Sequence, residues 1–458
     1  MSNSYYCEEL FTGRAWLHSA RFALDADGLI HAVEADVTPG SEDVRLGVVV
    51  PGIPNLHSHA HQRAMAGLAE RSGRGLDSFW TWRSLMYRHL QAMTPDDLEA
   101  IAAQLYLEMA EAGFTAVGEF QYLHHHSDGT PYDDVAEMTL RCRNAAREVG
   151  IGFAALPVYY AQGGFGGAAP GDGQRRFLSD RDGFHAILDS LKTQLSTDPA
   201  GLETLGLAPH SLRAATAEDL AFLEALEPDL PLHLHIAEQE KEVDDCVDWC
   251  GQRPVAWLYE HFNVDRRWCL IHATHLDDGE VASIAESGAV VGLCPVTEAN
   301  LGDGLFRARD FLDAGGRFGI GSDSHISINP VEELRWLEYG QRLSDHGRNR
   351  LAAGPDASTA RNLLEHCLEA GADALGQPAG ELAPGRRGDW LVLDRDHPLL
   401  VARRGDEPLD SWIFSGHPSV IREVYVGGRR IVEGGRHPER EAIAERFRTT
   451  LERLRTKA

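Results

Sequence analysis

The histidines of segment 54–63, PNLHSHAHQR, are the first residues in this chain whose spacing could support chemistry. His57 and His59 are two residues apart, so on an extended segment both imidazoles project from one face, as two ligands of one metal ion must. His61 breaks this pairing, and we expect it to face away from the ion. For an isolated His-x-His pair, a solvated polar loop is the alternative.

Polar side chains also end three other apolar runs. LPLHLHIAE carries His235 and, three residues later, Glu238; RWCLIHATH carries His272, and RFGIGSDSH carries Asp323. Catalytic zinc takes imidazole nitrogen and carboxylate oxygen as ligands and keeps one position for water. The predicted ligands of one divalent ion, with zinc as the expected metal, are His57, His59, His235 and Asp323.

Three of these residues have the chemistry of a hydrolytic site. A metal ion lowers the pKa of its water towards ~7, so hydroxide becomes available at neutral pH. Asp323 is placed to accept the proton of the water, and His272 to orient the nucleophile and stabilise a tetrahedral centre. Glu238 can pass a proton to a leaving nitrogen. An exposed carboxylate at a helix start is the alternative for Glu238.

The chain has eight short apolar runs, and the residues named above stand at the ends of some of these runs. Segments with helical spacing, such as 95–113, follow the runs. Strands covered on both faces read as continuous apolar runs, so eight strand–helix units predict an α/β fold of the (β/α)8 TIM-barrel type. Catalytic side chains in such a barrel lie at the carboxyl ends of the strands. A doubly wound open sheet is the alternative.

Both ends of the chain differ from this pattern. Residues 1–50 and 385–436 alternate in the manner of strands, with turns at Asp27–Gly28 and Gly427–Gly428, and the last residues predict a solvated amphipathic helix. The net charge of −27 disfavours nucleic acid and acidic membranes as partners. The chain has no apolar run near the ~18 residues that cross a bilayer and no secretory signal, so we expect a cytoplasmic protein. Seven cysteines without a paired pattern predict reduced thiols.

The order His-x-His, His-x-x-Glu, His and Asp resembles the amidohydrolase superfamily, and most of all its metal-dependent deaminase branch. GELAPGRRGDWLVLD is similar to the tail of that superfamily. The resemblance implies a small β-sandwich domain built from residues 1–50 and 380–440, a barrel at 51–379 and a C-terminal helix at 441–458.

Longer motifs narrow the resemblance to the formimidoylglutamate deiminase family of bacterial histidine degradation. They include NLHSHAHQRAMAGLAE, DSFWTWRSLMYR, HIAEQEKEVDDC and GIGSDSHISINPVEELRWLEYGQRL, and the likeness spans almost the whole chain. His61 departs from the family, which has phenylalanine there. The resemblance implies hydrolytic deimination of N-formimino-L-glutamate to N-formyl-L-glutamate and ammonia. Two-metal members of the superfamily use a carboxylated lysine on the fourth strand, and no lysine lies near ETLGLAPHSL, so we expect a single ion.

A dicarboxylate amidine needs local cations to hold its two carboxylates. FWTWR offers Arg83, and PHSLR offers His210 and Arg213; Gln62 and Tyr122 are further candidates for substrate contacts. A structural ion pair is the alternative for each arginine. The glycine-rich segment 163–176 lacks the ending of a phosphate loop, so we expect a mobile lid that carries Arg175 or Arg176. The tract His124, His125 and His126 predicts a solvated loop.

Two other functions stay open at this point. A deaminase of a guanine-like or adenosine-like ring would share the metal ligands but need no paired arginines. A metal-free scaffold that kept the barrel is the alternative outside enzymes. A homodimer is compatible with the family resemblance.

Overall fold

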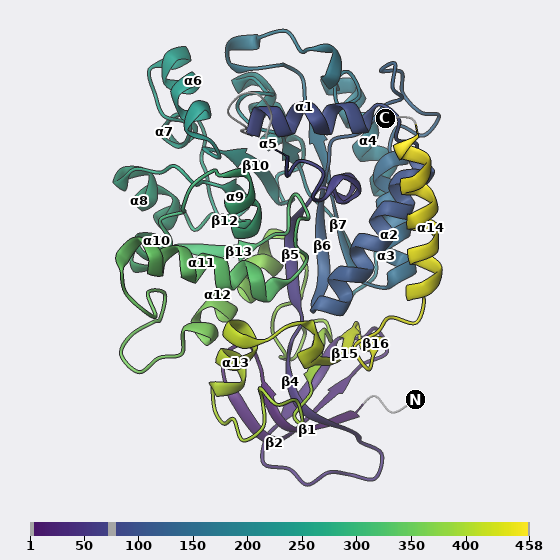
Figure 1. Ribbon diagram of the computed structural model, residues 1–458, viewed down its shortest axis with the longest axis vertical. Helices are drawn as coiled ribbons and strands as arrows, with labels where there is room; N and C mark the ends of the chain where they lie inside the picture. Colours follow the sequence, from purple (N-terminus) through teal and green to yellow (C-terminus); the bar gives the residue numbers. More distant parts are fainter. Residues whose placement is uncertain (1–3, 72–78, 457–458) are drawn as a thin grey trace.

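Parallel β-strands form the centre of the protein, and helices surround them (Figure 1). The computed structural model describes residues 4–71 and 79–456; Lys457 and the first two residues of the DSFWTWRSLMYR motif lie outside them. The barrel strands are β5 (Ile53–Ser58), β6 (Phe114–Gln121), β7 (Gly152–Tyr159), β8 (Glu203–Leu205) with β9 (Ala208–Pro209), β10 (Leu232–Ile236), β11 (Trp268–His272), β12 (Val290–Leu293) and β13 (Arg317–Ile320).

The strands pair in parallel in two arcs, β5 to β8 and β10 to β13. A bridge between Ser58 and Asp323 joins the two outer strands, and bridges at Leu207–Leu232 and Ser211–His235 join the two arcs across β8 and β9. These bridges close the barrel. Its fourth strand consists of β8 and β9, which Gly206 and Leu207 separate. The predicted (β/α)8 barrel is confirmed, and the open-sheet alternative is wrong.

Helices cover the outside of the barrel. They are α2 (Pro95–Ala112), α3 (Glu137–Val149), α4 (Arg181–Gln194), α5 (Ala217–Leu226), α6 (Glu240–Cys250), α7 (Pro254–His261), α8 (Asp278–Ser287), α9 (Pro295–Leu301), α10 (Ala308–Asp313), α11 (Pro330–Asp345) and α12 (Thr359–Ala374). The start and end of α2 show why the sequence forms a helix there. Thr94 and Asp97 make a reciprocal capping box, and Gly113 ends the helix with φ 103°.

An N-terminal segment and a segment that precedes the C-terminal helix form a second unit below the barrel (Figure 1). Its sheet follows the order β16-β15-β14-β4-β1-β2-β3. The strands are β1 (Ser4–Phe11), β2 (Trp16–Leu24), β3 (Ile30–Glu34), β4 (Val44–Pro51), β14 (Trp390–Leu393), β15 (Ile421–Val426) and β16 (Arg429–Glu433).

This sheet curls around its own core. Strands β2 and β14 are three positions apart, or roughly 14 Å in a flat sheet, yet the rings of Phe22 and Trp390 are 4.9 Å apart. The predicted β domain from both termini is present as one curled sheet. Because β4 continues through Gly52 into β5, this unit also places the first barrel strand. The division at residues 50 and 380 stays a prediction.

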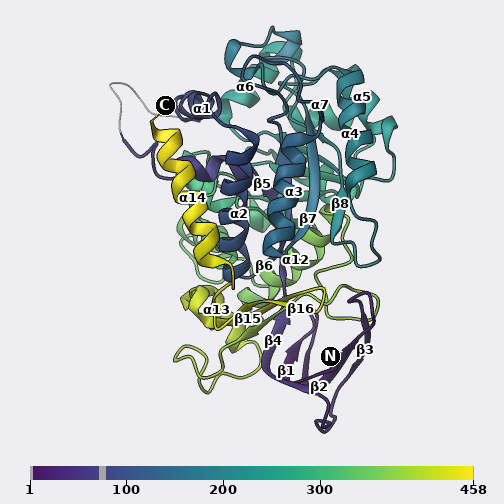
Figure 2. The same ribbon diagram turned by 90° about the vertical axis from the view of Figure 1, so that its right-hand side faces the viewer.

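The C-terminal helix α14 (Arg440–Arg455) lies along α2 (Figure 2). Arg453 pairs with Asp97, and Arg440 pairs with Glu111. Ile443 and Leu454 are buried, so only part of this helix is solvated. All seven cysteines are free thiols, as predicted. Among the described residues, no helix has both the length and the apolar character that a membrane span requires.

Candidate metal centre and substrate pocket

Four side chains from opposite arcs of the barrel converge at the carboxyl ends of the strands. The Nε2 atom of His57 lies 3.2 Å from that of His59 and 3.1 Å from that of His235. Asp323 Oδ1 lies 3.4 Å from His57 Nε2 and 3.3 Å from His59 Nε2. All four side chains are buried, and their donor atoms lie within 4.8 Å of one another.

Backbone carbonyls orient two of the imidazoles. The Nδ1–H group of His59 donates to the Phe120 carbonyl at 2.9 Å, and that of His235 donates to the His210 carbonyl at 3.0 Å. Their Nε2 lone pairs therefore face the centre. Burial lowers the pKa of His57, His59 and His235, which favours the neutral imidazole that binds metal.

Several lone pairs and a carboxylate oxygen thus point at one place, an arrangement that a cation stabilises. The residues fit a divalent metal ion of the zinc type. Asp323 and His272 hold positive φ angles of 39° and 68°, which is strained backbone for non-glycine residues and aims both side chains inward.

A second set of donor atoms, His272, Cys294 and Asp323, shares Asp323 with the first. Asp323 Oδ1 already faces His57 and His59, so this set adds two donors of its own. Lys192 pairs with Glu227 and Lys241 with Asp245 on the surface. Neither lysine lies at the fourth strand, where a carboxylated lysine would bridge two ions.

The predicted catalytic residues surround this centre. His272 Nε2 lies 3.8 Å from Glu238 Oε1 and 3.9 Å from Asp323 Oδ2. Burial raises the pKa of Glu238 to about 7. Burial alone would lower the pKa of His272, but the carboxylates of Glu238, Glu298 and Asp323 outweigh it and raise the pKa to about 10. The three carboxylates therefore favour the protonated form of His272.

A pocket opens onto the centre, and His59, His235, Glu238, His272 and Asp323 are among the residues that line it. All five predicted substrate contacts line it: Gln62, Arg83, Tyr122, His210 and Arg213. Arg213 has 12% of its side chain exposed, and its Nη2 atom lies 3.7 Å from Glu238 Oε2. Arg83 stacks on Trp80, with its guanidinium carbon 4.4 Å from the ring centroid.

The pocket also has aromatic and apolar walls that our sequence analysis missed. Helix α1 (Phe79–Leu90) supplies Phe79, Trp82, Met86 and Tyr87, and other elements supply Tyr160, Phe177 and Leu301. The residues of α1 stand at helical spacing with Arg83, so a helical reading of FWTWRSLMY would have found this face.

His61 lies beside the pocket and is not part of the donor cluster of His57, His59, His235 and Asp323. It is buried, and its Nε2 atom lies 2.8 Å from the hydroxyl of Tyr122, which also accepts a hydrogen bond from Gln62. His61 therefore packs against two of the predicted substrate contacts.

The prediction of a solvated loop for the tract His124, His125 and His126 was wrong for its first residue. His124 is buried and donates to the Val158 carbonyl at 2.8 Å, and His125, half-buried, donates to the Leu178 carbonyl at 2.7 Å. Only His126 is exposed. The loop after β6 turns inward over the end of β7, which its polar composition did not reveal.

The two arginines expected on a lid have other partners. Arg176 is buried and donates to the carbonyls of Leu90, Met93 and His125, so it ties the end of α1 to the loop after β6. Arg175 pairs with Asp172 at the surface. In the described structure, neither arginine is among the residues that line the pocket. Lid movement of segment 163–176 stays a prediction.

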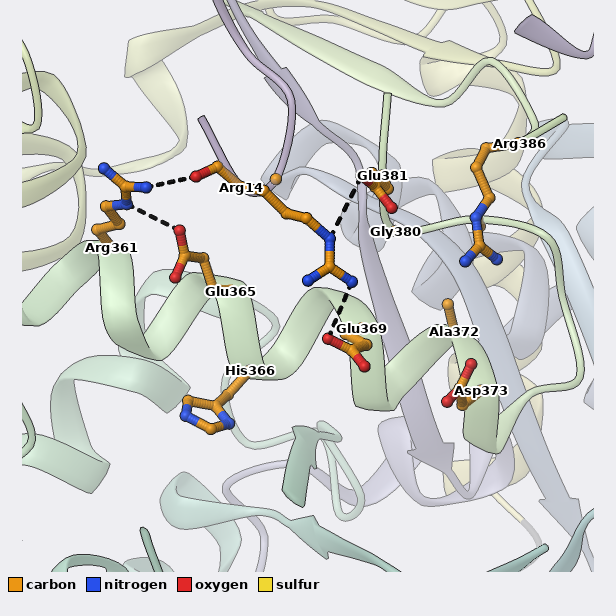
Figure 3. A pocket seen from close by; sticks show the side chains of 12 residues that line it. Arg14, Arg361, Glu365, His366, Glu369, Ala372, Asp373, Gly380, Glu381 and Arg386 are labelled. Carbon is orange, nitrogen blue, oxygen red and sulfur yellow. Dashed lines mark hydrogen bonds and ion pairs between the residues drawn. The ribbon is translucent and has the colours of Figure 1, made fainter. Parts of the chain in front are cut away.

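Another pocket lies between α12 and the loop 379–386; we call it the α12 pocket (Figure 3). Arg14 pairs with Glu369 and Glu381, each at 3.3 Å, and Arg361 pairs with Glu365 at 2.7 Å. Asp373 lies at its edge and pairs with Arg317, the first residue of β13. The α12 pocket is therefore at the amino ends of the strands, opposite the metal centre.

Comparison with known proteins identifies relatives over almost the whole chain. The model of the "Amidohydrolase family" matches residues 48–431. The formimidoylglutamate deiminase of Pseudomonas aeruginosa is 51% identical over 99% of both chains. The 5-methylthioadenosine/S-adenosylhomocysteine deaminase of Haloarcula marismortui is 28% identical over 90% of this chain and 88% of its own.

Solved structures agree with this fold. The crystal structure of an amidohydrolase from Brucella melitensis is 47% identical, covers 99% of each chain and has a TM-score of 0.93. An adenosine deaminase from Xanthomonas campestris with bound zinc has a TM-score of 0.81 over 99% of this chain and 98% of its own. At 20% identity, that similarity shows the fold alone.

Proposed function

The chain belongs to the amidohydrolase family and is a hydrolase of carbon–nitrogen bonds, and from this premise we propose that its substrate is N-formimino-L-glutamate. The products are N-formyl-L-glutamate and ammonia. The relative at 51% identity carries this activity in its name. The observation that supports it here is the pocket, which places Arg83 and Arg213 on the wall around the metal ligands.

One divalent ion, with zinc as the expected metal, would be held by His57, His59, His235 and Asp323. When bound, such an ion supplies a Lewis acid that lowers the pKa of water at the site. The remaining chemistry belongs to the side chains around it.

Asp323 is placed to accept the proton that the attacking water loses, and His272 orients that oxygen and stabilises the tetrahedral centre. The water oxygen adds to the formimino carbon, the bond from this carbon to the imino nitrogen breaks, and the nitrogen leaves as ammonia. Glu238 pairs with the cationic amidine and delivers a proton to the departing nitrogen. The position of Glu238 between His272 and Arg213 supports this role.

The two substrate carboxylates require cations because a buried unpaired anion is costly. Arg83 and Arg213 are the cations of the pocket wall, and Gln62, Tyr122 and His210 add hydrogen-bonding groups beside them. Arg213 already lies near the carboxylates of Glu238 and Glu242, each beyond normal hydrogen-bond distance, so its donors can turn to a substrate anion.

An assay of ammonia release tests the proposal. Metal-loaded protein is offered N-formimino-L-glutamate, guanine and adenosine, and we expect turnover of the linear amidine alone. Turnover of a purine in its place would support the ring-deaminase alternative, and no turnover of any of the three compounds would contradict the proposed substrate. The absence of a nucleic-acid partner and the presence of a homodimer are proposals that rest on net charge and on family resemblance, respectively. The cytoplasmic location stays a prediction.

A further inference from the structure

Glu298, a residue of the motif TEANLGDGLF, has no part in the mechanism above, yet it contacts one of its residues. It lies on α9, directly after the strand β12, and its side chain is 4% exposed. Its Oε1 atom lies 3.3 Å from His272 Nδ1 and accepts a hydrogen bond from the Cys294 backbone N–H at 3.0 Å. Glu298 is absent from the residues that line the described pocket.

The helix that carries Glu298 is fixed at both sides. The backbone N–H of Val296 donates to Glu333 Oε2 at 2.9 Å. The Thr297 hydroxyl lies 2.9 Å from the Ser324 hydroxyl and accepts from the Ser324 backbone N–H at 3.2 Å. Because Ser324 follows Asp323, α9 holds Glu298 at a set position relative to the metal ligand.

His272 ends β11 with a left-handed backbone, so its strand geometry does not fix the rotation of its ring. A carboxylate at Nδ1 decides which ring atom faces the reaction. With Nδ1–H held by Glu298, the Nε2 atom faces Glu238 and Asp323. A carboxylate that holds one ring nitrogen of a histidine in this way sets both orientation and tautomer.

We propose that Glu298 is a positioning residue for the reaction, which acts by holding the imidazole of His272 with Nε2 towards the attacking oxygen. This inference rests on the proposed function for its effect on turnover. The Glu298–His272 contact itself can be tested without any substrate.

The test compares Glu298→Gln with Glu333→Gln in zinc-loaded protein. Glu333 is a matched control because it is also buried and also holds α9, but in the part of the chain that the structure describes it makes no contact with His272. A neutral amide holds Nδ1–H less strongly than a carboxylate. We expect Glu298→Gln to lower kcat by roughly ten- to hundredfold, the usual loss for a group that orients a histidine. KM and zinc content should stay near those of the unsubstituted protein.

The second readout is the nitrogen NMR signal of the His272 Nδ1–H group in ¹⁵N-histidine-labelled protein, assigned by its absence in His272→Asn. We expect Glu298→Gln to shift or broaden this signal and Glu333→Gln to leave it unchanged. An unchanged signal, an equal fall of kcat in both variants, or loss of zinc in Glu298→Gln would each overturn the proposal. If N-formimino-L-glutamate is not the substrate, the NMR signal still reports on the contact.

Discussion

The pocket at the metal centre and the α12 pocket both collect charged side chains, but they arrange them differently. In the α12 pocket, Arg14 has 61% of its side chain exposed and lies 3.3 Å from Glu369 (Figure 3). At the metal centre, Arg213 has 12% exposed and lies 3.7 Å from Glu238, which has 6% exposed. Charges of the α12 pocket are therefore paired in water, whereas those of the metal centre are buried and only loosely paired.

The difference in burial and in charge pairing indicates which of the two pockets is functional. Exposed ion pairs contribute little because water already solvates both partners. Buried groups that face one point without close partners are costly in the free protein and become satisfied by a ligand. By this criterion, we expect a ligand in the pocket at the metal centre rather than in the α12 pocket.

The largest effect is expected from the metal ligands. Replacing His235 or Asp323 by alanine removes one of four donors, so the protein should lose its divalent ion and its turnover should fall to background. Metal analysis of the purified variants, together with the ammonia assay, measures both. Glu369→Ala in the α12 pocket serves as the control and should keep metal and activity.

Native protein should hold about one ion per chain, since neither of the two lysines that the structure describes, Lys192 and Lys241, is placed to bridge a second. Chelation should abolish turnover, and one equivalent of zinc should restore it. Two tightly held ions per active chain would contradict the single-metal centre, and full metal content in Asp323→Ala would remove Asp323 from the ligand set.

Glu238 comes next, because it reaches the substrate side of the centre and lies outside the ligand set. Glu238→Gln keeps the shape of the side chain and removes the proton carrier, so kcat should fall by ~10²–10⁴ while metal content persists. Steady-state kinetics and metal analysis on the same preparation check this. A near-normal kcat would assign proton transfer to another residue.

The arginines of the pocket are expected to act on substrate choice. Arg83→Met or Arg213→Met removes a charge-assisted contact, which should cost roughly 2–5 kcal/mol in kcat/KM for the dicarboxylate. Arg83 is the cleaner test, since Arg213→Met also leaves Glu238 and Glu242 without their nearby cation.

A substrate in which one carboxylate has become an amide provides the control for both arginines. Each variant should lose less on the matching amide than on the diacid, because the contact is already gone. Coupling energies near zero for both arginines would mean that they are structural, and the ring-deaminase alternative would return.

The smallest effect is expected in the α12 pocket. Arg14→Met removes two exposed ion pairs, so the free energy of unfolding should change by about 1 kcal/mol or less and kcat/KM should not change. Chemical denaturation and the ammonia assay measure the two quantities. A large loss of activity would show that the two ends of the barrel are coupled and that paired charge is a poor guide to function.

The convergence of the four proposed metal ligands could be predicted from sequence because they lie at the carboxyl ends of three strands of one barrel, β5, β10 and β13. Parallel strands bring their carboxyl ends together, so His57, His59, His235 and Asp323 needed only the correct fold class to meet. The apolar strands and the boundaries of α2 could also be predicted, since hydrophobic periodicity and capping residues depend only on residues close by in the sequence.

Contacts between distant segments could not be read in this way. His124, like His57, is a histidine near the carboxyl end of a strand, yet its Nε2 atom binds the Val158 carbonyl, which is 34 residues away. Arg176 donates to the carbonyls of Leu90 and Met93, which are more than 80 residues earlier in the chain. Glu298, which follows β12, contacts His272 at the end of the neighbouring strand β11. Each of these partners is set by where the loops turn.

The sequence by itself therefore determined the order of the strands, the residues at their carboxyl ends and the chemistry that those residues share. Only the tertiary structure decided which nitrogen of each histidine is free, which arginines are already paired, and which carboxylate orients His272. The physical reason is range: periodicity and chain order act locally, while the partner of a buried polar atom depends on the packing of the whole barrel.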